Sequence, residues 1–157
     1  MDLRLEKANS SQLIDCVETL SNSLLGKYYF EKSGSCESAI KEGLVTDTLF
    51  VAVTSQHVAG FFFYLPNGAF HSFPYLHLLA VKEEYRGQGV GKFLLQSWEG
   101  QTSRDKLFLC VSDFNTNAKI FYEKNGYRQV GMLPDLYRKD ITEYLMMKDR
   151  SSLLEKA

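Results

Sequence analysis

A short glycine-rich segment, placed between an apolar run and an amphipathic run, constrains this chain more than any other feature. Residues 76–81 form a nearly unbroken apolar run, short enough for a buried strand and too short for a typical helix. In residues 90–98 the apolar side chains recur at the spacing of one helix face. Residues 86–91 join the two runs. The sequence therefore predicts a strand, a tight turn and a helix, in that order.

The glycines of this turn have two interpretations. Main-chain amides at the start of a helix lack intrahelical acceptors and lie at the positive end of the helix dipole, which suits them to bind phosphate. Alternatively, the glycines serve only a tight connection. Gly87, Gly89 and Gly91 alternate with other residues, so neither the dinucleotide fingerprint G-x-G-x-x-G nor the pattern G-x-x-x-x-G-K-[ST] is present.

Composition limits the classes of protein to which the chain can belong. Its 157 residues, 45% of them hydrophobic, suffice for one well-buried domain, which we expect over residues 1–150 with a frayed tail at 151–157. Eighteen basic residues against 19 acidic ones, without a basic block, argue against a nucleic-acid partner. No apolar segment approaches the roughly 20 residues that span a bilayer, and residues 1–11 lack the apolar core of a signal peptide. We expect a cytoplasmic protein that does not bind membranes.

The cysteines give no sign of a metal centre or of disulfides. The chain has three cysteines, an odd number, at Cys16, Cys36 and Cys110. They are widely spaced and form no CxxC pair. They are expected to be reduced thiols, with Cys110 a core residue in a strand. No metal ligands are predicted.

The first half of the chain predicts a strand at 3–6, a helix at 13–20, a short helix at 35–42 and a hairpin of strands 48–53 and 58–65. Pro66-Asn67-Gly68 is expected to end the hairpin with a turn, and His57 to lie in its loop. Between the first two helices, Tyr28, Tyr29 and Phe30 either pack under a loop or form a wall that faces a substrate.

The second half predicts strands at 107–111, 127–130 and 141–147, interrupted around residues 133–135. A helix through 118–122 is expected to end at Asn125-Gly126. Strands and helices interleave between residues 75 and 130, which is the spacing of a strand-helix-strand crossover with parallel strands. The flanking hairpins are antiparallel. The chain is therefore expected to be an α/β (α+β) protein with a mixed sheet.

Two motifs resemble those of the GCN5-related N-acetyltransferases (GNAT superfamily). The pattern Arg-x-x-Gly-x-Gly after an apolar strand, formed by Arg86, Gly89 and Gly91, resembles the family's acyl-coenzyme A pyrophosphate loop. A second set matches another family motif in order and spacing, namely Asn115, Ala118, Phe121-Tyr122 and Gly126-Tyr127. The resemblance covers about residues 48–130, whereas the first 45 residues match only in general layout.

The resemblance implies a fold and a cofactor. The fold would be a single GNAT-like domain with a mixed, mostly antiparallel sheet of six or seven strands, a central parallel pair that splays apart, and about four helices. The cofactor would be acetyl-CoA (coenzyme A), bound in that gap at the carboxyl ends of the strands. The cofactor-binding residues would be Leu79, Ala80, Val81, Arg86, Gly87, Gln88, Gly89, Val90, Gly91, Lys92, Asn115, Asn117, Tyr122 and Lys124.

The resemblance also implies catalytic roles, each with a structural alternative. His77, whose side-chain type titrates near pH 6.5, would be the base, or else a core histidine bonded to a backbone carbonyl. Tyr122 would protonate the leaving thiolate, or else only pack in its helix, and the main-chain N–H of Leu79 would stabilise the oxyanion. Asn115 is equally understandable as a helix cap, and Lys92 and Lys124 as solvated surface lysines.

The expected activity is acetyl transfer from acetyl-CoA to a primary amine, by direct attack in a ternary complex, because no Cys-His-Asp arrangement suggests an acyl-enzyme. The amine would belong to a small molecule or a peptide, and the protein would be a monomer or a homodimer. Possible acceptor contacts are Tyr28, Tyr29, Phe30, Glu31 and Tyr75. The alternatives are a non-catalytic acyl-CoA sensor and, among enzymes, a protein or peptide N-acetyltransferase.

Overall fold

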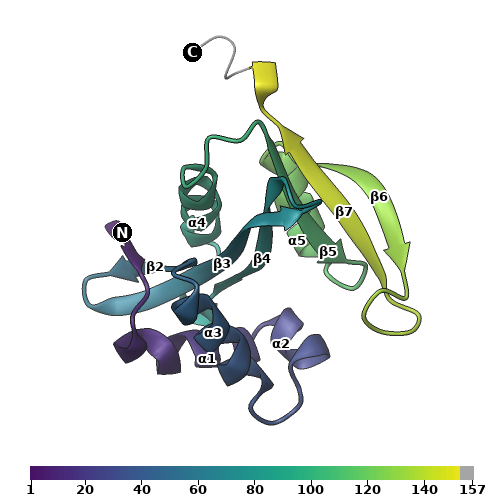
Figure 1. Ribbon diagram of the computed structural model, residues 1–157. Helices are drawn as coiled ribbons and strands as arrows, with labels where there is room; N and C mark the ends of the chain where they lie inside the picture. Colours follow the sequence, from purple (N-terminus) through teal and green to yellow (C-terminus); the bar gives the residue numbers. More distant parts are fainter. Residues whose placement is uncertain (153–157) are drawn as a thin grey trace. The chain divides into compact units, whose positions relative to one another are not determined.

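The computed structural model describes residues 1–152, and within them the chain forms one seven-stranded sheet (Figure 1). The sheet order is β1-β2-β3-β4-β5-β7-β6. The strands are β1 (Leu3–Lys7), β2 (Leu49–Thr54), β3 (His57–Ala69), β4 (Phe73–Val81), β5 (Lys106–Ser112), β6 (Arg128–Pro134) and β7 (Thr142–Asp149). The helices are η1 (Ser10–Gln12), α1 (Leu13–Ser21), α2 (Leu24–Tyr29), α3 (Ser35–Val45), η2 (Glu83–Tyr85), α4 (Val90–Glu99) and α5 (Thr116–Lys124).

The fold class predicted from the sequence is confirmed. Strands β4 and β5 form a parallel pair, in which Tyr75 lies opposite Phe108 and Leu76 opposite Leu109. Antiparallel pairs flank it, β1 with β2 and β2 with β3 on one side and β5 with β7 and β7 with β6 on the other. The splaying of the parallel pair stays a prediction.

The chain divides into two compact units, and the division crosses β3 and β4. Unit 1 comprises Met1–Tyr64 and Leu78–Gln101, and unit 2 comprises Leu65–His77 and the described residues from 102 to 152.

In unit 1, helices cover both faces of β2 and the first part of β3. The residues of β2 from Leu49 to Val53 are all buried, which requires cover on both faces. In Figure 1, α1 and α3 lie on one side of these strands and α4 on the other. Leu20 of α1, Ile40 of α3 and Trp98 of α4 are fully buried and supply much of this cover. The amphipathic pattern of residues 90–98 thus places α4 where the sequence predicted it.

In unit 2, α5 packs on one face of β5 and β7, and the opposite face carries the aromatic and polar side chains of interest. The Lys119 ammonium lies 4.4 Å from the ring centroid of Tyr144, which stands opposite Val111 in the register. On the other face, the ring of Phe108 contacts those of Phe70 and Phe73, at centroid distances of 5.5 and 5.6 Å. Since Tyr75 pairs with Phe108, Tyr75 and His77 share this second face.

Two expectations for the first half of the chain are wrong. The segment around Tyr28 and Tyr29, for which no helix was expected, contains α2, whereas the five α-helices of residues 1–152 agree with the expected number of about four. Strand β3 does not stop at Pro66 but continues to Ala69, and His57 is its first residue. The pairing of β2 with β3 ends at Phe63. Pro66 lies beyond this point, so its missing N–H group costs no hydrogen bond between β3 and β2.

Smaller differences concern the ends of elements. Helix α3 extends three residues beyond the predicted Glu42, and β6 continues to Pro134, four residues beyond the predicted Val130. Cys110 lies in a strand, as expected, but is partly exposed. The predicted frayed tail begins at 151, and residues 153–157 lie outside the described part of the chain. Among the described residues, no helix is both long and apolar enough to span a membrane.

Candidate functional site

The glycine-rich loop of unit 1 presents its backbone at the start of α4. Gly87 and Gly89 have positive φ angles of 73° and 86°, and Gly89 is the N-cap residue of the helix. A Cβ atom built on either glycine would have no neighbour within 4 Å. The backbone conformation, rather than close packing, therefore requires glycine at both positions. The result is an exposed turn whose amides surround the positive end of a ten-residue helix, as an anion site requires.

Side chains of the loop brace it from within. The Nε of Arg86 donates to the carbonyl oxygen of Val81 at 3.2 Å, and the Nε2 of Gln88 donates to that of Glu84 at 2.8 Å. The backbone amide of Arg86 donates to the Glu83 oxygen at 3.2 Å. The side chains of Arg86 and Gln88 thus form hydrogen bonds within the turn, while Gly87 and Gly89 are exposed to solvent. Lys92 is exposed on the first turns of α4.

The end of β4 lies close against β3. Leu79 and Val81 are half-buried, whereas Ala80 points into the core with 5% exposure. A Cβ on Gly60 of β3 would lie 2.6 Å from the Ala80 carbonyl oxygen. Gly60 therefore permits a close approach of the two strands directly before the loop.

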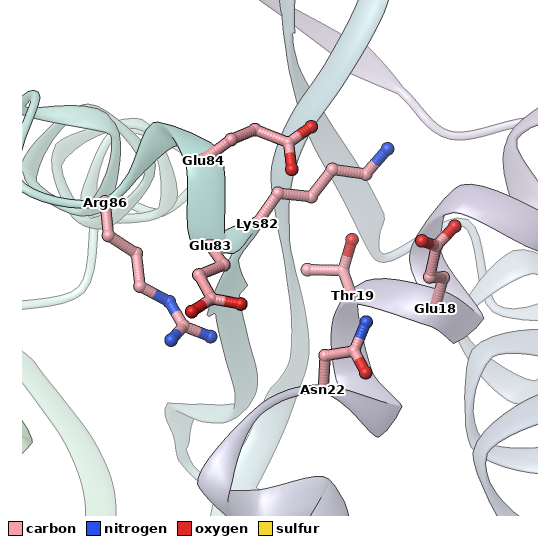
Figure 2. Close-up of a pocket in the computed structure, with 7 residues that line it drawn as sticks. All are labelled: Glu18, Thr19, Asn22, Lys82, Glu83, Glu84 and Arg86. Carbon is pink, nitrogen blue, oxygen red and sulfur yellow. The ribbon is translucent and has the colours of Figure 1, made fainter.

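A polar cavity of about 90 Å³ lies between α1 and the connection from β4 to α4 (Figure 2). Glu18, Thr19 and Asn22 line it from α1 and its C-cap, and Lys82, Glu83, Glu84 and Arg86 line it from the connection. Three carboxylates against two cations make this cavity unsuitable for a diphosphate. It is distinct from the exposed glycine backbone.

Tyr122 in unit 2 is buried within α5. Its ring packs against those of Phe121 and Tyr127, at centroid distances of 5.2 and 5.9 Å. Burial raises the pKa of the phenol well above its ordinary value. Tyr122 therefore keeps its proton throughout the neutral and mildly alkaline range.

Asn115 acts as the N-cap of α5. Its Oδ1 accepts the backbone N–H of Ala118 at 3.4 Å, as the capping interpretation predicted. Asn117 and Lys124 are exposed on the same helix. A contact from any of the three to a cofactor stays a prediction.

His77 is exposed, which does not agree with the alternative that it is a core residue. Tyr75, two residues earlier on the same face, is largely buried. Burial raises the pKa of Tyr75, and its hydrogen bond to Cys110 raises it further. Tyr75 also bonds to Tyr137 in the connection between β6 and β7.

A buried carboxylate beside Tyr75 was not among the candidates from the sequence. Glu143 of β7 is 3% exposed, and the hydroxyl of Ser112 on β5 donates to its Oε2 at 2.6 Å. The two residues are register partners on the face that carries Tyr75. The available signal was an acidic residue within the mostly apolar run 141–147, which is uncommon on a covered strand.

The predicted acceptor residues divide between the units. Tyr28 and Tyr29 lie on α2, Phe30 is its C-cap, and Glu31 is exposed beyond it, all in unit 1, whereas Tyr75 belongs to unit 2. Tyr28 is 44% exposed, more than a residue that only packs under a loop would be.

The predicted cofactor-binding and catalytic residues are also divided between the two units. Unit 1 contains the residues of the glycine-rich loop and Leu79–Val81. Unit 2 contains His77, Asn115, Asn117, Tyr122 and Lys124. In the described residues, no group of three or more His, Cys, Asp or Glu side chains is placed to hold a metal ion.

The family model of the acetyltransferase (GNAT) domain matches residues 46–129, more than half of the chain. The chain belongs to this family. The match spans β4, the glycine-rich loop and α4, and it ends within β6. It therefore contains both motifs found in the sequence.

Relatives and solved structures are similar to this GNAT-family chain to different extents. An uncharacterized N-acetyltransferase, MJ1530 of Methanocaldococcus jannaschii, is 36% identical over 76 residues, which are 46% of this chain and about half, 49%, of that relative. A GNAT-family acetyltransferase from Bacillus cereus is 18% identical, with a TM-score of 0.79 over 96% of this chain and 99% of its own. The PaiA N-acetyltransferase from Thermoplasma acidophilum, solved in complex with coenzyme A, is 19% identical, with a TM-score of 0.73 over 95% and 99%.

Proposed function

We propose that this protein is an acyl-CoA-dependent N-acetyltransferase that moves the acetyl group of acetyl-CoA to a primary amine by direct attack. Membership of the GNAT family supports this activity. The observation that carries it is the glycine turn, which opens α4 directly after β4 with an exposed backbone and positive φ at two glycines. The coenzyme A complex of the Thermoplasma acidophilum protein, which is similar in fold, supports the choice of cofactor.

The loop fits the diphosphate of coenzyme A because its amides are exposed and a side chain at Gly87 or Gly89 would stand in that space. In this proposal Arg86–Gly91 and Lys92 hold the diphosphate. Backbone groups of Leu79–Val81 bond the pantetheine arm. Asn115, Asn117 and Lys124 contribute further contacts from α5.

The amine must be neutral to attack, although an aliphatic ammonium has a pKa near 10.4. We assign the removal of its proton to His77, which is exposed and belongs to a residue type that titrates near neutral pH. The amine nitrogen then bonds to the thioester carbon, whose oxygen accepts from the main-chain N–H of Leu79. The carbon–sulfur bond breaks, the sulfur leaves with the bonding electron pair, and the nitrogen gives its second proton to solvent, so that the products are a neutral amide and the coenzyme A thiolate.

Tyr122 is assigned to the leaving sulfur. A thiol of pKa about 8.5 is a stronger acid than a phenol with a raised pKa, so Tyr122 stabilises the developing thiolate by sharing its proton. The raised pKa also keeps this hydrogen-bond donor protonated through the neutral and mildly alkaline range.

The acceptor is assigned to the amines, either small molecules or peptides. The aromatic side chains of Tyr28, Tyr29, Phe30 and Tyr75 are suited to an organic amine, and Glu31 to a positive charge on it. Tyr28 is 44% exposed, so part of its side chain faces solvent on the surface of α2.

The test is a screen of small amines, polyamines, aminoglycosides and peptides for release of free thiol from acetyl-CoA. Tyr122→Phe should lower turnover with the best amine by about 10²-fold to 10⁴-fold. Tyr144→Phe is the matched control, because it removes a phenol from β7 outside the proposed site and should leave turnover unchanged. Tight coenzyme A binding without thiol release for any amine would favour the acyl-CoA sensor, and parent-like turnover in Tyr122→Phe would refute its role.

A further inference from the structure

Lys82 joins three parts of unit 1 at the point where β4 ends and the loop begins. Its backbone amide donates to the Ala59 oxygen of β3 at 2.8 Å, and its own carbonyl accepts the amide of Tyr85 in η2 at 2.9 Å. Its Nζ lies 2.6 Å from the Oδ1 of Asp15, in the first turn of α1. Lys82 therefore connects the sheet, the helix α1 and the turn that precedes the glycines.

The glycine loop depends on its two ends for its position. Gly87 and Gly89 have open space around their Cβ directions, so packing there does not hold the loop. At the far end, Val90 is buried in the core with 1% exposure and fixes the start of α4. At the near end, the residue with comparable anchoring is Lys82, whose side chain is 16% exposed.

The ion pair of Lys82 with Asp15 joins a mostly covered ammonium to a carboxylate whose side chain is 42% exposed. Burial lowers the pKa of Lys82, but the hydrogen bond to Asp15 and the charges of Asp15, Glu18 and Glu84 raise it by more. Lys82 thus remains charged although it is mostly covered. In contrast, the pair of Lys41 with Glu37 on α3 has a similar distance, 2.8 Å, but side chains 58% and 50% exposed, where water screens the interaction.

We propose that Lys82 and Asp15 are positioning residues that hold the glycine loop in the orientation in which its amides bind the diphosphate of the cofactor. The inference rests on the proposed function. Neither side chain needs to contact the cofactor, since both act through the backbone between β4 and α4. Without the pair, the turn keeps its backbone hydrogen bonds and the bonds that Arg86 and Gln88 make within it, but it loses its connection to α1, and its amides lose part of their alignment.

The experiment measures binding of coenzyme A by calorimetry to the parent, Lys82→Met, Asp15→Asn and the double variant. Each single change should raise the Kd by about 10-fold, because small misplacements of binding groups are costly. The double variant should show about the same 10-fold effect rather than about 100-fold, because both changes break one interaction. Lys41→Met, which breaks the exposed pair of α3, is the matched control and should bind like the parent.

A kinetic readout separates positioning from general damage to the fold. With the best amine, kcat at saturating acetyl-CoA should stay within about 2-fold of the parent while KM for acetyl-CoA rises. The value of kcat/KM for S-acetylpantetheine, which lacks the diphosphate, should not change.

Parent-like Kd values in the single variants, additive effects in the double variant, or an equal loss with S-acetylpantetheine would each overturn the inference. A parent that does not bind coenzyme A would instead refute the proposed function itself. The two failures are therefore distinguishable.

Discussion

Replacing Gly60 with alanine should damage the end of β4 in a way that can be calculated from the structure. The new Cβ would lie 2.6 Å from the Ala80 carbonyl oxygen, 3.2 Å from the Cα of Val81 and 3.0 Å from a methyl group of Leu94. The Leu94 methyl can rotate away, but the first two atoms belong to backbone, so the strands must separate by several tenths of an ångström. Gly60 itself has no positive φ, so the effect comes from crowding alone.

Crowding of a well-packed core costs about 1–3 kcal/mol. Alanine also restricts the backbone of the unfolded chain, which stabilises the folded state by about 0.4–1 kcal/mol and so offsets part of this cost. A net loss of about 1–2 kcal/mol corresponds to a fall in Tm of roughly 2–8 °C for a chain of this size. Since the displaced atoms adjoin Leu79 and Val81, the Kd for coenzyme A should also rise several-fold.

The assay is thermal unfolding followed by circular dichroism, together with calorimetric titration of coenzyme A. Gly131→Ala on β6 is the matched control, because its Cβ would be 3.7 Å from the nearest atom, an ordinary contact. A Tm of Gly60→Ala equal to or above that of Gly131→Ala would refute the reasoning from backbone crowding.

Three further predictions concern titratable and buried groups. If His77 is the base, kcat/KM of the parent should rise between about pH 5.5 and 8, and His77→Ala should remove this rise; the same pH profile in both proteins would exclude the role. Burial raises the pKa of both thiols, that of Cys16 to about 12, but only Cys110 is partly exposed, so iodoacetamide at pH 8 should label Cys110 slowly and leave Cys16 unlabelled, as mass spectrometry would show. Because the Cys16 pKa is raised above the unfolded value near 8.5, the free energy of unfolding should fall between about pH 8.5 and 12, and less so in Cys16→Ala. Ser112→Ala removes the hydroxyl donor of the buried Glu143 and should lower stability by about 1–3 kcal/mol in urea unfolding, whereas an unchanged midpoint would show that water replaces the hydroxyl.

The elements best predicted from the sequence are those whose pattern is local. The apolar run of β4, the glycine turn and the one-sided helix α4 follow from residues adjacent in the chain, and the structure agrees with their predicted order. Helix α5 also forms where its pattern predicted a helix, and Asn115 caps it, which was one of the two interpretations of that residue. The family assignment rests on these same segments.

The features that the sequence did not reveal depend on distant contacts. Helix α2 has only six residues and includes Gly26, a poor helix former. A Cβ at Gly26 would lie 2.0 Å from the Leu20 carbonyl oxygen, so close packing on α1 requires glycine there. Similarly, Gly68 suggested a turn in the sequence but lies inside β3. A Cβ at this position would lie 2.9 Å from the Cβ of Tyr75, so only glycine leaves room for that side chain. The pairing of Ser112 with Glu143 joins residues 31 apart and follows only from the register.

The sole tryptophan of the chain gives experimenters a built-in optical reporter. Trp98 is fully buried in α4, the helix whose first turn adjoins the glycine backbone. Excitation near 295 nm therefore senses that helix alone, without signal from the tyrosines elsewhere. A shift of the emission on titration with nucleotide would then register events at the loop in real time, with no dye attached and no acceptor amine identified.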